Sequence, residues 1–79
     1  MPRFPSDVPI ARVKRALGLL GFSVVREGNH ISMIRQNADG TRTSLTMPNH
    51  PTLKASTLRT ILTQTQIARE DFLSSLDRS

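Results

Sequence analysis

Residues 21–47 read GFSVVREGNHISMIRQNADGTRTSLTM, and the fold class can be inferred from this segment first. It is rich in β-branched and aromatic residues, which favour strands, and two turn sequences divide it. Gly28-Asn29 is typical of a hairpin turn. Asn37-Ala38-Asp39-Gly40 is typical of a longer turn, because Asn and Asp bond their own backbone and Gly tolerates positive φ. The stretch therefore predicts three antiparallel strands, over residues 22–26, 30–36 and 41–47.

Helical periodicity precedes this predicted sheet. Apolar residues at spacings of three, four and three predict a helix from about Pro9 to Leu20, with one core-facing stripe: Ile10, Val13, Leu17 and Leu20. We expect Ser6 or Asp7 to cap this helix and Gly21 to end it in the left-handed conformation. Arg3 to Pro5 should form a frayed terminus.

A second helical pattern follows the sheet. It should begin at Ser56 or Thr57 and turn three apolar residues to the core: Leu58, Ile61 and Leu62. A break at 66–68 precedes a short last helix over 69–76. The predicted fold is therefore α+β, with the order helix, three-stranded antiparallel sheet, helix and short C-terminal helix, in one domain spanning residues 1–79.

Strand alternation assigns the two faces of the predicted sheet. If Ile31 and Met33 face the helices, His30 lies on the opposite, solvent-facing side. Ser32, Ile34 and Gln36 share that side. His30 should therefore be accessible at the edge of the sheet.

The charge of the chain is strongly basic and uneven. Its 79 residues include 11 Lys/Arg and 6 Asp/Glu, for a net charge of +5 and a pI of about 11.5. Residues 1–66 carry nine basic and three acidic side chains, a net of +6, whereas residues 67–79 carry two and three, a net of −1. The basic surface, which includes Arg12, Lys14 and Arg15 on the first helix, favours a phosphate-rich partner or an acidic protein.

The composition excludes several classes of protein. Cysteine is absent, so the chain has no disulfide framework, thiolate nucleophile or zinc-finger spacing, which suits a reducing cytosol. No apolar run is long enough for a membrane span or a signal peptide. A chain this short buries a small core, so we expect a soluble cytoplasmic protein with a shallow surface site.

Two histidines are the candidate catalytic residues. His30 follows the Gly28-Asn29 turn, which would allow a ligand backbone to approach an imidazole that exchanges protons near neutral pH. His50, in the run Met47-Pro48-Asn49-His50-Pro51, is a secondary candidate. Four cations are candidates to hold a phosphate: Arg26, Arg35, Arg42 and Lys54. Two histidines without clustered carboxylates do not make a metal site, and no cofactor motif is present.

Several short motifs, taken in order, resemble the HicA family of toxins from bacterial toxin–antitoxin pairs. They are Gly21-Phe22, Gly28-Asn29-His30, Met47-Pro48-Asn49-His50-Pro51, Ser56-Thr57-Leu58-Arg59-Thr60-Ile61-Leu62 and Glu70-Asp71-Phe72. The resemblance implies a small mRNA interferase with a fold similar to the double-stranded RNA-binding domain, in which His30 is catalytic and Gly28 and Asn29 form its turn. Asn29 stands where many members have Ser or Thr, and Ser56 where glycine is common.

The resemblance also implies a partner, a neutralising antitoxin of the HicB type that covers the basic surface and the histidine. Leu19 and Ile34, which periodicity leaves facing outward, are candidate apolar contacts for it. The predicted function is thus a metal-independent endoribonuclease acting on mRNA. A non-catalytic double-stranded RNA-binding module and a structural adaptor for an acidic protein are the alternatives.

Overall fold

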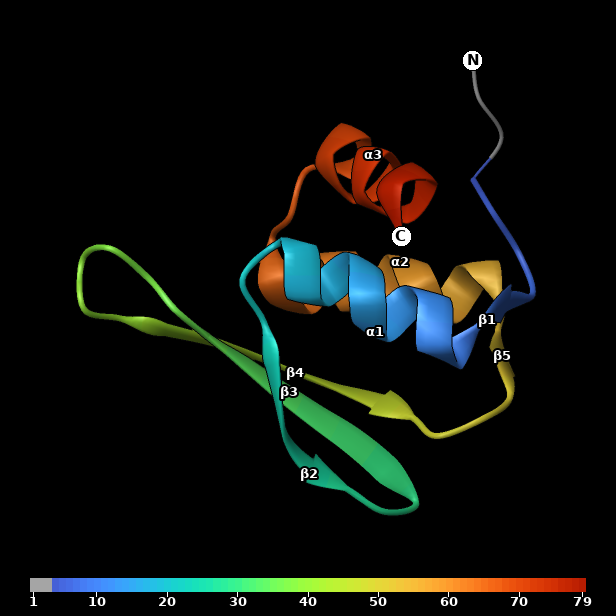
Figure 1. The fold of residues 1–79 in the computed structure, drawn as a ribbon, viewed down its shortest axis with the longest axis horizontal. Helices are drawn as coiled ribbons and strands as arrows, with labels where there is room; N and C mark the ends of the chain where they lie inside the picture. Colours follow the sequence, from blue (N-terminus) through green and yellow to red (C-terminus); the bar gives the residue numbers. More distant parts are fainter. Residues whose placement is uncertain (1–3) are drawn as a thin grey trace.

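The computed structural model describes residues 4–79 as three helices and two antiparallel sheets (Figure 1). In chain order the elements are β1 (Val8–Pro9), α1 (Ile10–Leu19), β2 (Ser23–Glu27), β3 (His30–Gln36), β4 (Arg42–Pro48), β5 (Thr52–Leu53), α2 (Ala55–Thr65) and α3 (Arg69–Arg78). The order of helix, three strands and two further helices confirms the predicted α+β class.

The larger sheet is the predicted antiparallel meander, in the order β2-β3-β4 with β3 in the centre. Along β3 and β4 the register runs from His30 opposite Pro48 to Gln36 opposite Arg42. His30 therefore lies at one end of the central strand, and the turn over residues 37–41 lies at the other end. The position of a residue along this ladder decides whether it can take part in a site with His30.

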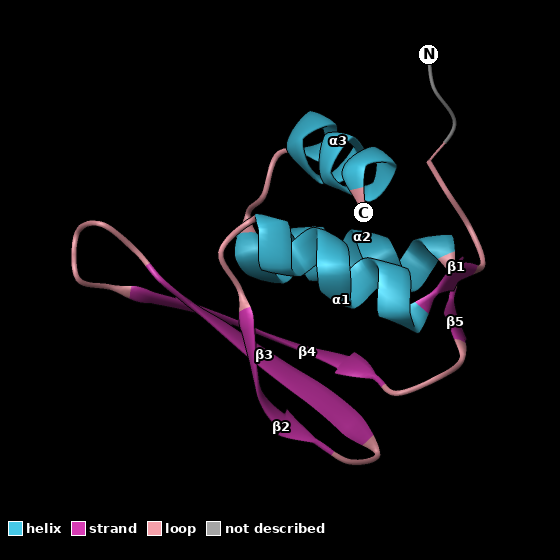
Figure 2. Ribbon diagram, viewed as in Figure 1, coloured by secondary structure: helices cyan, strands magenta, loops and turns pink. Residues whose placement is uncertain are grey.

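The helices gather on one side of this sheet and leave its other face uncovered (Figure 2). Ile31 and Met33 of β3 are buried under the helices, as the alternation predicts. The core between the two layers also contains Val13, Leu17, Leu45, Met47, Leu58, Ile61 and Phe72. None of the helices described between residues 4 and 79 is long and apolar enough to cross a membrane.

The expectations for exposed apolar residues are only partly confirmed. Leu19 is 52% exposed, as predicted, but Ile34 is half-buried. Val24 and Val25 of β2 are 44% and 61% exposed because β2 is an edge strand that the helices do not cover.

From Phe4 onward the segment before α1 packs against the helices, so the predicted fraying is wrong for Phe4. This ring is 6% exposed and stacks on Phe72 with 6.4 Å between centroids. Arg3, the first residue of the predicted frayed range, lies outside the described residues. Sequence periodicity could not reveal this packing, because an isolated aromatic residue before a helix carries no periodic signal.

The start of α1 also differs from the prediction. The helix begins at Ile10, Pro9 takes the N-cap position, and neither Ser6 nor Asp7 caps it through a side chain. The segment before it is instead extended, because Val8 and Pro9 pair with β5 in a two-residue ladder. This short β1–β5 sheet fastens the N-terminal segment to the loop that follows β4.

Arg12 is a structural residue rather than part of the free basic surface. Its Nε and Nη2 atoms both donate to the carbonyl oxygen of Leu76, at 3.1 and 2.9 Å. Leu76 is near the C-terminus of α3, where the helix dipole favours a cation. The guanidinium therefore ties α1 to α3, and the expected surface role of Arg12 is wrong.

The end of α1 and both ends of α2 depend on backbone conformation and not on side-chain caps. Gly21 has a φ of 98°, which confirms the predicted left-handed stop. α2 begins at Ala55, one residue before the predicted start, and Lys54 at its N-cap makes no side-chain capping bond. Gln66 ends α2 with a φ of 59°, at the predicted break.

Candidate functional site

The turn that carries His30 is fastened to the loop after β4. Gly28 closes the turn by donating its N–H to the carbonyl oxygen of His30 at 3.0 Å. Asn49, in the loop after β4, makes two hydrogen bonds to this turn. Its side-chain Nδ2 donates to the Gly28 carbonyl at 2.9 Å, and its backbone N–H donates to the Asn29 carbonyl at 3.1 Å. His30 is thus held in place although its own side chain is exposed.

A β-bulge in β2 determines where Arg26 points. Val24 lies opposite Met33, but Arg26 lies opposite Ser32, so Val25 is an extra residue that interrupts the alternation. Without the bulge, Arg26 would lie opposite Ile31 and share its buried side of the sheet. With it, Arg26 shares the uncovered side with Ser32.

The uncovered side therefore carries a row of polar side chains across all three strands. Arg26 lies opposite Ser32, and Ser32 lies opposite Thr46. His30 is two residues from Ser32 on the same face of β3, a separation of about 7 Å along a strand. A guanidinium, two hydroxyls and an imidazole thus face the same space.

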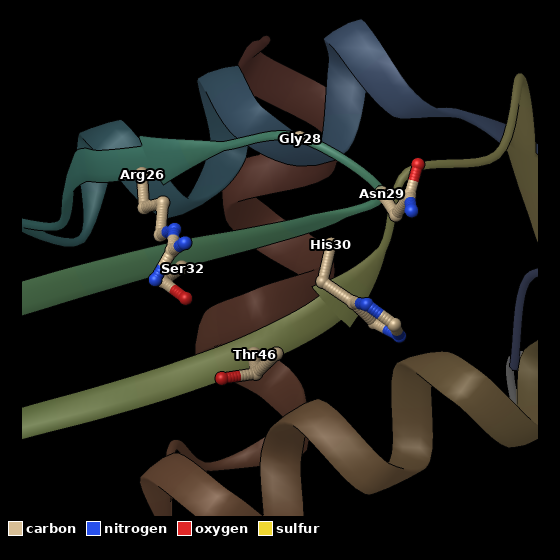
Figure 3. Close-up of a pocket in the computed structure, with 6 residues that line it drawn as sticks. All are labelled: Arg26, Gly28, Asn29, His30, Ser32 and Thr46. Carbon is tan, nitrogen blue, oxygen red and sulfur yellow. The ribbon is translucent and has the colours of Figure 1, made fainter.

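This space is an open depression of about 510 Å³ lined by Arg26, Gly28, Asn29, His30, Ser32 and Thr46 (Figure 3). In the figure, the side chain of Arg26 extends toward Ser32, and the ring of His30 projects past the end of β4. Such an arrangement can hold an anion by a charge-assisted hydrogen bond from Arg26 while the imidazole gives or takes a proton beside it.

Thr46, which lines the depression, is held in place from α2. The side-chain amide of Gln64 accepts from the Thr46 N–H at 3.0 Å and donates to the Thr46 carbonyl at 3.2 Å. These two bonds satisfy the backbone N–H and carbonyl of Thr46, which lies on an edge strand and would otherwise be free to pair with another strand. They also hold β4 at the residue that faces Ser32.

Arg35 is not brought to this depression. The alternation along β3 places it on the same side as Met33, toward the helices. Its Nε donates to Asn37 Oδ1 at 3.0 Å, its Nη1 donates to the Leu20 carbonyl at 3.4 Å, and its Cζ lies 4.9 Å from the centre of the Phe22 ring. Arg35 therefore braces the α1–β2 connection.

The other proposed cations lie apart from His30. Arg42 is opposite Gln36, at the far end of the ladder and about 20 Å along the strands from His30. Lys54 and His50 line a separate depression of about 300 Å³ together with Asp7, Thr52, Leu53 and Thr57. Of the four predicted phosphate ligands, only Arg26 shares a depression with His30.

Sequence reasoning missed four residues that shape the site: Ser32, Thr46, Asn49 and Gln64. Alternation placed Ser32 on the face of His30 but assigned it no role. Thr46 could be found only from the β3–β4 register, and the Gln64 bond only from the packing of α2. Asn49 lies directly before His50, and the sequence gives no sign that it bonds to the turn before His30. In the part of the chain that the structure describes, no group of three or more acidic or histidine side chains could hold a metal ion.

The fold and the depression together define a class of protein, a small basic α+β domain that presents one imidazole and one guanidinium on the uncovered face of its sheet. A family model described as HicA toxin of bacterial toxin-antitoxin matches residues 10–67, which is more than half of the chain and includes every residue lining the depression. The chain therefore belongs to the HicA toxin family and is the toxin of a toxin–antitoxin pair, with an antitoxin as its partner. No curated protein and no solved structure matched the chain.

Proposed function

We propose that this toxin is an endoribonuclease that cleaves mRNA in the cytoplasm, and that His30 is its catalytic residue. One observation carries the proposal: an exposed imidazole is held at the end of a strand in a depression that also contains the Arg26 guanidinium. RNA suits such a site because it supplies its own nucleophile, the 2′-hydroxyl. Residues 1–79 would act as a single domain.

The chemistry needs one proton transfer at His30. The 2′-oxygen attacks the adjacent phosphorus, the bond from phosphorus to the 5′-oxygen breaks, and a 2′,3′-cyclic phosphate and a 5′-hydroxyl result. Neutral His30 takes the proton of the 2′-hydroxyl, or protonated His30 gives a proton to the departing 5′-oxygen, and water serves the other transfer. Arg26 stabilises the charge that develops on the phosphate.

The substrate contacts that we propose follow the lining of the depression. Gly28 and Asn29 would contact the RNA backbone, and Arg26 the scissile phosphate. Lys54 and His50, in their own depression, would contact a flanking phosphate, and Arg42 would attract the polyanion at longer range. Arg35 has bonds within the fold, so we assign it no contact with RNA. We further propose that the antitoxin is of the HicB type and covers His30.

An RNA cleavage assay tests the proposal. Purified wild type should cleave a structured mRNA fragment, and His30→Ala should lose cleavage at least a hundredfold while keeping its fold and RNA affinity, because an exposed imidazole contributes little to packing. His50→Ala is the matched control and should lose less. Cleavage by a folded His30→Ala variant would overturn the catalytic assignment.

The products distinguish the mechanism. Activity should survive excess EDTA and leave cyclic phosphate or 3′-phosphate ends. Products with 3′-hydroxyl ends, or activity that requires Mg²⁺, would instead indicate attack by water at a metal site. RNA binding without any cleavage by the wild type would favour the non-catalytic double-stranded RNA-binding module.

A further inference from the structure

Two guanidinium groups from different helices converge on the ring of Phe4, in the helical layer. The Cζ atom of Arg59 in α2 lies 5.4 Å from the ring centroid, and that of Arg69 in α3 lies 5.0 Å from it. The ring is buried and stacks on Phe72, so its position is fixed. Cation–π attraction therefore holds two positive charges at one place on the surface.

Neither arginine has an acidic partner among the described residues. The ion pair found in residues 4–79 joins Lys14 to Glu27, and residues 1–3 contain no carboxylate. Two like charges held close together repel each other, and an anion placed between them would remove that repulsion.

The space for such an anion is present. A depression of about 240 Å³ beside the ring is lined by Phe4, Arg59, Leu62, Thr63 and Arg69. We name it the Arg59–Arg69 clamp. Its floor is apolar, because Phe4 is buried and Leu62 is half-buried, and its rim is cationic, because Arg59 and Arg69 are exposed. It contains none of the residues that line the depression around His30.

We propose that the Arg59–Arg69 clamp binds a carboxylate side chain of the antitoxin. Guanidinium groups that stack on a ring by their faces keep N–H groups on their edges, and these match the two oxygens of a carboxylate. The apolar floor suits the aliphatic stem of a glutamate or aspartate. The proposal rests on the family membership, which supplies the partner, and not on the catalytic role of His30.

The surrounding charge favours a single carboxylate over RNA. Glu70 and Asp71 occupy the first turn of α3, directly after Arg69, and residues 67–79 carry a net charge of −1. A polynucleotide brings a charge with every nucleotide and would meet these acidic groups as well as the arginines. The clamp also belongs to the helical layer, which Figure 1 shows on one side of the sheet, whereas the alternation along β3 places His30 on the other side.

The test compares two double variants of equal charge. Arg59→Gln with Arg69→Gln removes the clamp, and Arg15→Gln with Arg78→Gln removes two exposed positive charges elsewhere. Binding of the purified antitoxin encoded beside this gene is measured by calorimetry, and thermal unfolding and RNA cleavage are measured separately. We expect the dissociation constant of the clamp variant to rise at least tenfold above that of the control variant, with cleavage unchanged.

Other results would overturn the proposal. Equal weakening in both double variants would mean that only net charge matters. Loss of RNA binding in the clamp variant would identify a phosphate site. A third variant, Arg59→Lys with Arg69→Lys, keeps both positive charges near the ring but lacks the planar guanidinium groups. It keeps the test valid if the glutamine variant does not fold. The lysine variant should bind three- to tenfold more weakly than wild type, and wild-type affinity would exclude paired recognition of a carboxylate. Because the readout is antitoxin binding, a failure of the His30 assignment leaves this test unaffected.

Discussion

Replacing Gly28 by alanine should separate the stability of this toxin from its activity. The φ of Gly28 is not positive, and an added Cβ would have no protein atom within 4 Å. The fold therefore has no steric need for glycine at this position. Where alanine fits the native backbone, the substitution stabilises a protein by about 0.4–1 kcal/mol through the unfolded state. We expect the melting temperature of Gly28→Ala to be unchanged or a few degrees higher.

Activity should respond in the opposite direction. Gly28 lines the depression beside His30, so a methyl group there would occupy space in which we propose that the RNA backbone binds. A displacement of the substrate by about 1 Å costs on the order of a hundredfold in rate. That factor corresponds to about 2.7 kcal/mol of transition-state stabilisation. Single-turnover cleavage of RNA, measured beside thermal unfolding, gives both quantities.

Two other glycines provide matched controls. Gly18 is exposed on α1, and an added Cβ would meet nothing within 4 Å, so Gly18→Ala should stabilise the helix by about 0.5–1 kcal/mol and leave cleavage unchanged. Gly21 has a φ of 98°, and a Cβ there would lie 3.2 Å from Arg35 Cδ. Gly21→Ala should therefore destabilise by at least about 1–2 kcal/mol. Wild-type cleavage by Gly28→Ala would refute the idea that this glycine exists for substrate approach.

Three further predictions concern the fold. Phe4→Ala should lower the free energy of unfolding by about 3 kcal/mol, as for other buried rings, and no loss in a denaturant titration would mean that the terminus frays in solution. Arg12→Met should cost about 1–2 kcal/mol because two bonds to the Leu76 carbonyl are lost, whereas the exposed Arg15→Met should stay within about 0.5 kcal/mol, and equal effects would contradict the assignment. The Thr41 hydroxyl, and then its N–H, lower the pKa of Asp39 below its usual 3.8, so the stabilisation is present above that value and is lost as pH falls through the lowered one. Unfolding curves of Asp39→Asn should lack this acid-dependent change, and an identical pH profile for wild type and variant would exclude it.

The sheet and helices could be predicted because their signals are local. Turn residues and β-branched runs define β2 to β4, and the apolar stripe defines α1. The spacing of Ile31 and Met33 identifies the buried face, and with it the exposure of His30. These inferences need only the periodicity of one element at a time.

The sequence predicted only the part of the site whose residues lie on a single strand. His30 and Ser32 share a face of β3 by alternation. The position of Arg26 depends instead on the bulge at Val25, and the local sequence does not predict this extra residue. Arg35 illustrates the opposite error. Its charge suggested a phosphate ligand, yet the carbonyl of Leu20 and the ring of Phe22 engage it from outside β3. The charge of a residue makes it a candidate phosphate ligand, but the strand register determines whether it lies near His30.

The geometry of the depression bears on how strongly this toxin can act by itself. A single imidazole can serve one of the two proton transfers in 2′-hydroxyl attack, and one such group contributes roughly 10²–10⁴-fold in rate. Arg26 is the only described cation that shares the depression, so charge stabilisation is modest as well. If the chain cleaves mRNA as proposed, we expect a slow enzyme, but one cut is enough to inactivate a message. His30 is exposed in the structure, so in the proposed mechanism we expect the antitoxin to restrain cleavage by covering it. If that partner also engages the Arg59–Arg69 clamp, it is held by a surface that takes no part in cleavage. Variation in the depression could then alter RNA preference without releasing the inhibitor.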